Sequence, residues 1–378
     1  MHPTARRLIP ILAITPVAAA GILLNASTAE AAKPSAAPRP AVHDAADSTK
    51  EQRVVKQFWT PAKMAAARPL DLVRSRGGRT TATPGGGRTI TLPAPGAHVV
   101  KRADTPAEPT ASASPTQAAP TAPATPTPTA QAETPTPTPS PTSPAATLSA
   151  RSPGAAWTAG GTIVRTEGRV FFTYQGRSAS CSGTAVTSAN KSVVLTAGHC
   201  VKLGGAFHTN WVFVPGYDNG SRPYGTWVAT SLLTTPQWNA SEDMNFDVAA
   251  AVVAPLNGRR LVDVVGGQGV AFNQPRGRQM YAFGYPAAGP YNGSKLIYCS
   301  GRVFDDFLVS SDQGLTCDMT GGSSGGGWFL GFSEATGAGT LNSVNSFKYN
   351  FASYWMFGPY FGPEAQAVYT TAQNQDAT

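Results

Sequence analysis

The chain has 378 residues, of which only 13% are charged, and it contains 39 glycines and 33 prolines. Its net charge of +8 is unevenly distributed: residues 1–150 hold 15 Lys and Arg against 8 Asp and Glu (+7), whereas residues 151–378 hold 14 against 13 (+1). A nearly neutral C-terminal region excludes the basic surface that nucleic-acid binding requires, so no nucleic-acid partner is expected.

Residues 1–32 have the pattern of a signal peptide. Arg6 and Arg7 precede an apolar run over residues 8–24, and small residues flank Glu30 where a signal peptidase cleaves. Two prolines interrupt the run, and spanning a bilayer takes about 20 uninterrupted apolar residues. We therefore expect a secreted, extracellular protein with no stable membrane insertion after cleavage.

Two segments of low apolar content follow the signal peptide. Residues 33–104 lack the hydrophobic periodicity of a stable core and are interpreted as a propeptide or disordered arm. One helix start is predicted within them, with Thr60 as N-cap and Pro61 at the first helical position. Residues 105–150 alternate Pro with Thr or Ser and form a stiff Pro/Thr-rich linker, suited to cell-wall association.

Residues 151–378 read as an all-β domain. Short runs rich in Val, Phe, Tyr and Thr alternate with Gly, Asn and Pro turns, which is the pattern of one or two small β-barrels. The expected strands cover residues 168–174, 192–196, 211–214, 227–231, 248–253, 278–283 and 343–349. A helical period is expected only near residues 363–370.

Four cysteines lie in this domain, and in an exported chain they predict two disulfides. The residues themselves leave all three pairings open, although nearest neighbours give two small rings. A zinc site is the alternative reading, but no Cys-x-x-Cys spacing supports it. No metal or other cofactor is expected.

His199 is the candidate general base. The domain contains two histidines, His199 and His208. His199 follows an apolar strand that ends in the turn Thr196-Ala197-Gly198, where a side chain is held rigidly at the mouth of a cleft. His208 stands between glycines and threonine and is expected in a surface loop.

Asp247 and Ser324 complete a nucleophile–base–orienter set. Asp247 enters an apolar strand, where a carboxylate needs a partner, although Glu242 and Asp243 are competing acids. Ser324 lies in a glycine-rich stretch that is either a plain flexible loop or a turn around an oxyanion, with Gly322 and Ser324 N–H as donors. The order His, Asp, Ser excludes α/β-hydrolases and subtilisins.

The blocks around His199, Asp247 and Ser324 resemble the three signature blocks of chymotrypsin/trypsin-like serine proteases, closest to the secreted actinomycete branch of glutamyl endopeptidases. The resemblance covers residues 157–372 and implies a double antiparallel β-barrel within the domain at 151–378. It also implies the disulfides Cys181–Cys200 and Cys299–Cys317. Ser323 stands where the family has the aspartate of an activation ion pair, so activation by that pair is not expected.

The resemblance also assigns a substrate pocket. Asp318 is six residues before the nucleophile, at the pocket base, which implies a preference for Lys or Arg. Val344 and Asn345 are assigned to the later wall, where glutamyl-selective members carry a histidine that this chain lacks. Glutamyl specificity is therefore not expected.

The resulting prediction is a secreted, monomeric serine endopeptidase that hydrolyses polypeptides through an acyl-enzyme on Ser324. Two alternatives stay open. One is a catalytically silent binding module on a protease scaffold, displayed at the cell surface. The other is an esterase using the same triad, since acyl-enzyme chemistry also accepts esters.

Overall fold

The computed structural model describes residues 39–75, 80–84 and 152–378. The predicted signal peptide and the Pro/Thr-rich linker lie outside the described residues, as does Arg151. Strands predominate over helices, which confirms the all-β class expected from the short alternating runs.

Six antiparallel strands close into the first barrel. They are β5 (Glu167–Tyr174), β6 (Arg177–Val186), β7 (Val193–Thr196), β10 (Thr209–Pro215), β11 (Trp227–Thr234) and β12 (Ala249–Val253). The order is β6-β5-β10-β11-β12-β7, and pairing of β6 with β7 closes the ring. The strands predicted over residues 168–174, 192–196, 211–214, 227–231 and 248–253 correspond to β5, β7, β10, β11 and β12, whereas β6 was not predicted. A two-stranded hairpin lies beside it, formed by β8 (Lys202–Leu203) and β9 (Ala206–Phe207).

The second half of the domain contains two groups of strands. The first group forms a six-stranded sheet of β4 (Ser152–Ala156), β13 (Gly269–Val270), β14 (Gln279–Gly284), β15 (Ile297–Arg302), β18 (Gly327–Ser333) and β19 (Ala338–Val344). The second comprises β16 (Phe304–Asp305), β17 (Gln313–Thr316), β20 (Phe347–Tyr349) and β21 (Ala352–Gly358). A core that includes Met280, Trp328 and Met356 lies between the two groups. The strand predicted over residues 343–349 is interrupted, because Asn345 and Ser346 leave the ladder between β19 and β20.

Helices are short and lie at the connections. They are α3 (Ile163–Thr166), η1 (Gly198–Cys200), α4 (Pro236–Ser241), η2 (Met244–Phe246), α5 (Leu261–Val265) and α6 (Pro363–Gln373). The helix expected near residues 363–370 is α6, which begins at a proline in its first turn. Among the described residues, none of the helices has both the length and the apolar character to cross a bilayer.

The N-terminal segment is folded onto the domain, which corrects the interpretation of residues 33–104 as disordered in the part described. It contains β1 (Ala41–Asp44), α1 (Thr49–Phe58), α2 (Pro61–Ala65), β2 (Arg68–Arg74) and β3 (Thr80–Pro84). The predicted N-cap is correct, since Thr60 Oγ1 accepts a hydrogen bond from Lys63 N at 3.2 Å. Helix α1 was not predicted, although Ser48 and Glu51 form a capping box at its start.

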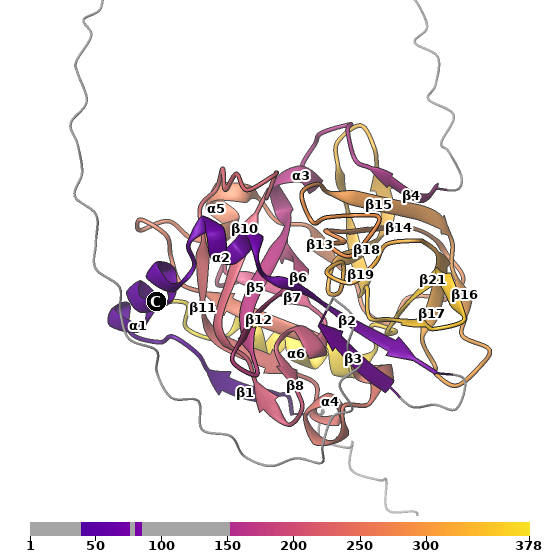
Figure 1. The fold of residues 1–378 in the computed structure, drawn as a ribbon, viewed down its shortest axis with the longest axis horizontal. Coiled ribbons are helices and arrows are strands. Elements are labelled where there is room, and N and C mark those ends of the chain that lie inside the picture. The colour runs from indigo at the N-terminus through magenta and orange to yellow at the C-terminus, as the bar shows by residue number, and fades with distance from the viewer. Residues whose placement is uncertain (1–38, 76–79, 85–151) are drawn as a thin grey trace, which may run out of the picture. The chain divides into compact units, whose positions relative to one another are not determined.

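This segment folds without a core of its own because the first barrel supplies one. Trp59 is 2% exposed, and its Nε1 donates a hydrogen bond to the Asn210 carbonyl at 2.5 Å. Strand β1 extends β11 as an antiparallel neighbour. Strand β2 then pairs with β6 of the first barrel and with β20 of the second half, in both cases in parallel. In Figure 1, β2 crosses the molecule between the magenta strands and the orange and yellow ones.

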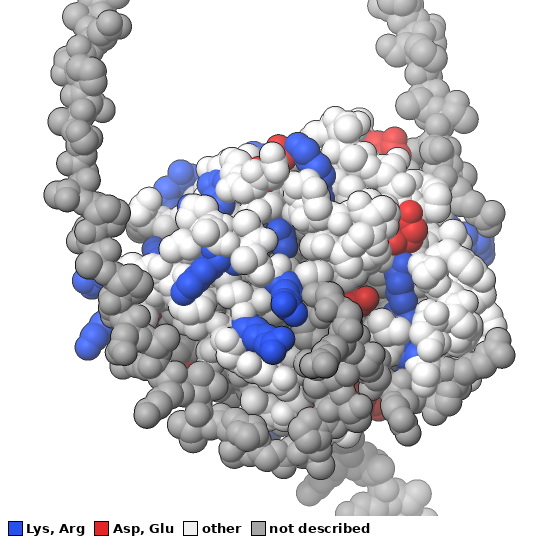
Figure 2. Space-filling view, viewed as in Figure 1, with Lys and Arg blue, Asp and Glu red and all other residues white. Residues whose placement is uncertain are grey.

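Charged side chains are dispersed over the molecular face seen in Figure 2. The blue Lys and Arg side chains stand apart and do not form a continuous band. This arrangement agrees with the nearly neutral balance of residues 151–378.

Candidate active site

His199 is fixed by the carboxylate of Asp247. The imidazole Nδ1 lies 2.8 Å from Asp247 Oδ2, and the backbone N–H of His199 donates to Asp247 Oδ1, also over 2.8 Å. Both side chains are fully buried. With Nδ1 carrying the proton toward the carboxylate, Nε2 is left with its lone pair available, as a general base requires.

The local sequence explains how these two residues meet. β7 ends at Thr196, and η1 turns His199 back toward the start of β12, where Asp247 lies. Gly198 permits the approach, because a Cβ there would come within 2.9 Å of Asp247 Oδ1 and 2.7 Å of the Trp238 ring. Glu242 and Asp243, the competing acids, bond instead to backbone N–H groups of Gly205 and Asn245.

A third donor to the carboxylate was missed in the sequence. Ser346 Oγ donates to Asp247 Oδ2 at 2.5 Å, and Ser346 is 1% exposed. It lies in the gap between β19 and β20, inside a stretch that the sequence predicted as one continuous strand. The adjacent polar residues Asn345 and Ser346, which interrupt the alternation of polar and apolar residues, were the only available signal.

Ser324 lies in a tight turn between β17 and β18 that glycine alone permits. Gly322 and Gly325 adopt φ of +94° and +80°. A Cβ at Gly325 would overlap Thr196 Oγ1 and the Ser182 carbonyl, and one at Gly326 would overlap the Phe283 carbonyl. The glycines therefore serve close packing against the strand before His199, which argues against a plain flexible loop.

Two buried residues brace this turn. Ser182 N–H donates to the Ser324 carbonyl at 2.7 Å, and Ser182 Oγ donates to the Gly322 carbonyl at 2.9 Å. Asn345 Nδ2 donates to the Ser323 carbonyl at 3.0 Å. Ser182 was not identified from the sequence, where its position after Cys181 was the only clue. The Ser324 turn is thus held by both halves of the domain.

The hydroxyl of Ser324 makes no hydrogen bond to Nε2 of the imidazole in this structure. His199 Nε2 is buried and has no hydrogen-bond partner. Ser324 Oγ instead donates to the carbonyl oxygen of Leu70 in β2, at 3.4 Å. The Gly322 N–H, predicted as an oxyanion donor, donates to the same carbonyl oxygen at 3.0 Å.

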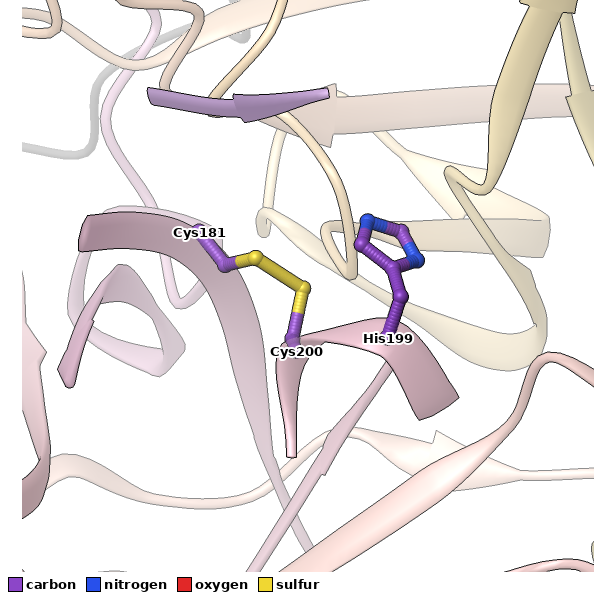
Figure 3. Close-up of side chains that lie close together, drawn as sticks. All are labelled: Cys181, His199 and Cys200. Carbon is purple, nitrogen blue, oxygen red and sulfur yellow. A yellow bond between two sulfur atoms is a disulfide. The ribbon is translucent and has the colours of Figure 1, made fainter. Parts of the chain in front are cut away.

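Both disulfides have the pairing that the resemblance implied. Cys181 is bonded to Cys200 and Cys299 to Cys317. Figure 3 shows the imidazole of His199 standing beside the first of these bonds. Cys181, His199 and Cys200 place potential metal ligands within 4.8 Å of one another, but the two sulfur atoms are bonded to each other, so neither is a thiolate.

His208 is not in a surface loop, contrary to the prediction. It is 3% exposed and stacks on Phe172 with ring centroids 4.3 Å apart. Its Nε2 lies 2.9 Å from the His199 carbonyl. Burial lowers the pKa of His208 to about 3, which keeps the ring neutral. His208 therefore supports the backbone of His199.

A cavity of about 380 Å³ lies next to the turn, lined by residues that include Asp71, Asp318, Thr320, Lys348 and Tyr354. Asp318, the residue predicted at the pocket base, lines this cavity, and its Oδ1 accepts a hydrogen bond from Tyr291 at 2.7 Å. Lys348 also lines the cavity, and its Nζ donates to the carbonyls of Cys317 and Ser353. Burial lowers the pKa of Lys348 to about 8, against the opposing effects of Asp71 and Asp318.

Val344 and Asn345, which the sequence placed in the pocket, do not line this cavity. Val344 is fully buried in the hydrophobic core. Asn345 is also buried, with Oδ1 accepting a hydrogen bond from Trp328 Nε1 at 2.7 Å. Lys348, which follows the interruption between β19 and β20, lines the cavity instead.

Another buried acid lies between the two halves. Glu167, at the start of β5, accepts hydrogen bonds from Thr184 Oγ1 at 2.6 Å and Gly327 N at 3.1 Å. Burial raises its pKa to about 8, and the two hydrogen bonds offset only part of that rise. Glu167 is therefore mostly protonated at neutral pH.

Known proteins with similar structures are proteases. Protease Anisep from Arthrobacter nicotinovorans has a TM-score of 0.55 and 49% sequence identity, covering 57% of this chain and 98% of that one. The thermostable serine protease AL20 from an extremophilic microorganism has a TM-score of 0.54 and 44% identity, covering 57% of this chain and all of that one. These similarities confirm the double-barrel fold.

The other comparisons contribute less. An extracellular metalloprotease of Bacillus subtilis (strain 168) is 35% identical over 71 residues, which is 18% of this chain and only 22% of that protein. No family model matches the chain. The fold, together with 49% identity over nearly the whole of Anisep, decides the assignment. The chain belongs to the chymotrypsin/trypsin-like family of serine proteases.

Proposed function

We propose that this protein is a secreted, monomeric serine endopeptidase in which Ser324 is the nucleophile, His199 the general base and Asp247 the orienting acid. The observation that carries the proposal is the buried His199–Asp247 pair, with Nδ1 2.8 Å from the carboxylate and Nε2 left without a partner. Packing of the Ser324 turn against the strand before His199 supports the role of the serine.

The reaction has two stages. Ser324 Oγ bonds to the carbonyl carbon of the scissile peptide while its proton passes to His199 Nε2. The tetrahedral intermediate then breaks its C–N bond, and His199 returns the proton to the leaving amine. Water repeats the sequence to release the acid. Asp247 stabilises the imidazolium that forms each time, and the N–H groups of Gly322 and Ser324 stabilise the oxyanion.

The substrate class is polypeptide, with the 380 Å³ cavity as the primary pocket. Export is supported by the signal-like residues 1–32 and by the two disulfides, which persist in oxidising compartments. Residues 33–104 are proposed to be a propeptide and residues 105–150 a linker that holds the domain near the cell wall. Sequencing the N-terminus of the secreted protein tests these boundaries.

Labelling with a fluorophosphonate tests the nucleophile. The probe is expected to modify Ser324, identified by mass spectrometry of the tryptic peptide. Ser324→Ala should abolish both labelling and peptide hydrolysis without unfolding the chain. The matched control is Ser323→Ala, because this neighbouring serine bonds the Thr320 carbonyl and not the catalytic groups. Labelling that survives Ser324→Ala at the wild-type rate contradicts the proposal.

Comparing peptide and ester substrates of the same sequence separates the alternatives. An endopeptidase hydrolyses both, whereas an esterase hydrolyses only the ester. A silent binding module is not labelled by the probe and hydrolyses neither substrate. The expected outcome is hydrolysis of both substrates, with both activities lost in Ser324→Ala.

A further inference from the structure

The active-site groups are occupied by the chain's own backbone. The carbonyl oxygen of Leu70 accepts hydrogen bonds from Gly322 N at 3.0 Å and from Ser324 Oγ at 3.4 Å. Gly322 N–H is one of the donors proposed for the oxyanion, and Ser324 Oγ is the proposed nucleophile. One carbonyl oxygen therefore engages both groups, whereas a bound substrate places its carbonyl oxygen on the N–H donors and its carbonyl carbon at Ser324 Oγ.

The strand that carries Leu70 spans the space between the two halves. Pro69 pairs with Ser180 of β6, and Leu72 pairs with Phe347 of β20. Leu70 and Leu72 are 0% and 1% exposed, respectively. Asp71, between them, lines the primary pocket. It also packs closely on Gly321, since a Cβ added to Gly321 would lie 2.8 Å from the Cβ of Asp71. The segment thus covers the nucleophile, an oxyanion donor and the pocket together.

The direction of this strand disfavours cleavage of its own peptide bond. The chain enters beside β6, in the barrel that carries His199, and leaves along β20. The Cα of Leu70 consequently lies on the side of the base, and the amide nitrogen of Asp71 lies on the pocket side. Cleavage requires His199 to protonate the leaving nitrogen, so a nitrogen on the pocket side is poorly placed to leave.

Contacts outside the cleft hold the segment in place. β1 adds to β11 over Ala41–Asp44, and the Trp59 indole is buried on the first barrel near Phe171, with ring centroids 5.6 Å apart. Covalent connection to the domain keeps the local concentration of the segment high, which favours occupancy beyond what its own affinity provides.

We propose that residues 39–75 are an intramolecular inhibitor that fills the active-site cleft in the reverse direction to a substrate, with the Leu70 carbonyl on the oxyanion donor and Asp71 in the primary pocket. This inference rests on the proposed function of Ser324. In this state the nucleophile is covered by β2, and Nε2 of the base has no hydrogen-bond partner. Release of the segment lets Ser324 reach His199 and opens the pocket.

The rate of fluorophosphonate labelling of the full chain tests the inference. Leu72→Asp places a charge at a buried position of β2 and should detach the strand. Labelling of Ser324 is expected to become at least about tenfold faster than in the wild-type chain, since a buried unpaired charge is worth more than that factor. Val54→Asp is the matched control, because Val54 lies in the same segment but is 45% exposed on α1. It should label at the wild-type rate.

A second variant and an add-back experiment complete the test. Trp59→Ala removes the anchor on the first barrel, away from the cleft, and should also accelerate labelling, so the test does not depend on Leu72→Asp folding. A synthetic peptide of residues 39–75 should slow labelling of the Leu72→Asp chain, and the same peptide carrying Leu72→Asp should not. Mass spectrometry should find the Leu70–Asp71 bond of the peptide intact.

The outcomes separate the two proposals. Equal, rapid labelling of wild-type, Leu72→Asp and Trp59→Ala chains overturns the inhibitor and leaves the proposed function standing. Cleavage of the peptide between Leu70 and Asp71 overturns the reversed orientation. Absence of labelling in all chains, with the variants folded by circular dichroism, overturns the proposed function and this inference with it.

Discussion

Ser346 and His199 share one oxygen of Asp247. Ser346 Oγ donates to Asp247 Oδ2 at 2.5 Å, and the imidazole Nδ1 of His199 lies 2.8 Å from the same atom. The other oxygen accepts the His199 backbone N–H. A buried carboxylate is tolerated only when its lone pairs are satisfied, and these three donors come from both halves of the domain.

Removing the serine donor should impair catalysis more than binding. Ser346→Ala leaves a buried carboxylate with one donor fewer, so the orientation of the imidazole is less well held. We expect kcat to fall about tenfold with little change in KM, because a hydrogen bond to a charged group is worth about 1.5–3 kcal/mol. Steady-state kinetics in the Leu72→Asp background, where the site is open, provide the measurement. An unchanged kcat shows that Ser346 has no part in positioning the triad.

Because Glu167 is buried in its protonated form, we expect the free energy of unfolding of the chain to fall as pH rises. The folded chain retains a proton that the unfolded chain loses between pH 4.5 and about 8, since burial raises the pKa across that interval. Stability is therefore greatest below pH 4.5 for this group and falls by about 1.4 kcal/mol per pH unit up to about pH 8.

Glu167→Gln should remove that decline. The amide does not ionise; its oxygen can accept from Gly327 N–H, and its nitrogen can donate to Thr184 Oγ1, which in the wild-type chain donates to Glu167. Thermal unfolding in the Ser324→Ala background is expected to show a higher Tm for the variant at pH 8 and nearly equal Tm values at pH 4.5. Glu364→Gln on half-buried α6 controls for the loss of one negative charge. A lower Tm at pH 8 contradicts the assignment.

Because of Asp71, we expect residues 39–75 to bind the active site less tightly as pH rises. Burial raises the pKa of Asp71 from 3.8 to about 6, although Lys348 and His199 act in the opposite direction and Asp318 lines the same cavity. The bound state keeps a proton that the released segment loses between these values. Binding is thus strongest below pH 3.8 and weakens until about pH 6.

Asp71→Asn should mimic the protonated side chain at every pH. The ratio of wild-type to Asp71→Asn labelling rates is expected near one at pH 4 and on the order of ten at pH 7, consistent with a raised pKa. Taking the ratio cancels the effect of pH on the catalytic groups common to both chains. A faster Asp71→Asn chain at pH 7 shows instead that attraction to Lys348 dominates.

Close packing at the Ser324 turn predicts that alanine substitution is more destabilising at Gly325 than at Gly331, although both glycines have a positive φ. Gly325 and Gly331 both have positive φ, but only at Gly325 would a Cβ overlap neighbouring atoms. Gly331→Ala should cost about 1 kcal/mol of stability, from the backbone alone. Gly325→Ala should cost several times more and abolish labelling, because the turn must move. Denaturant unfolding of both variants provides the comparison; equal costs contradict the packing argument.

Much of the domain was predictable because its determinants are local. Short apolar runs and turn signals located every strand of the first barrel except β6, and the order of His199, Asp247 and Ser324 selected one architecture. What failed depends on distant contacts. His208 follows two glycines closely in sequence, which suggests a loop, but it is buried against Phe172 in space. Ser182 and Ser346 gain their roles only when the two halves meet.

The N-terminal segment illustrates the same limit more strongly. Its own residues provide too few apolar side chains for a core, so its sequence suggests disorder. Trp59, Leu70 and Leu72 become buried only against the domain, some 100 or more residues away in sequence. The capping box of Ser48 and Glu51 was a readable signal for α1, but nothing local indicated that β2 would enter the active site.

The parallel pairing of β2 has a consequence for the architecture of the protein after processing. This strand is the link that makes one sheet of thirteen strands from both halves of the domain. Its departure divides that sheet and leaves β6 and β20 with free backbone edges on either side of the nucleophile. Free edges bind extended chains through main-chain hydrogen bonds, whatever their side chains. Release of β2 is therefore expected to convert one continuous sheet into two separate edges, on β6 and β20, that can each pair with an extended substrate.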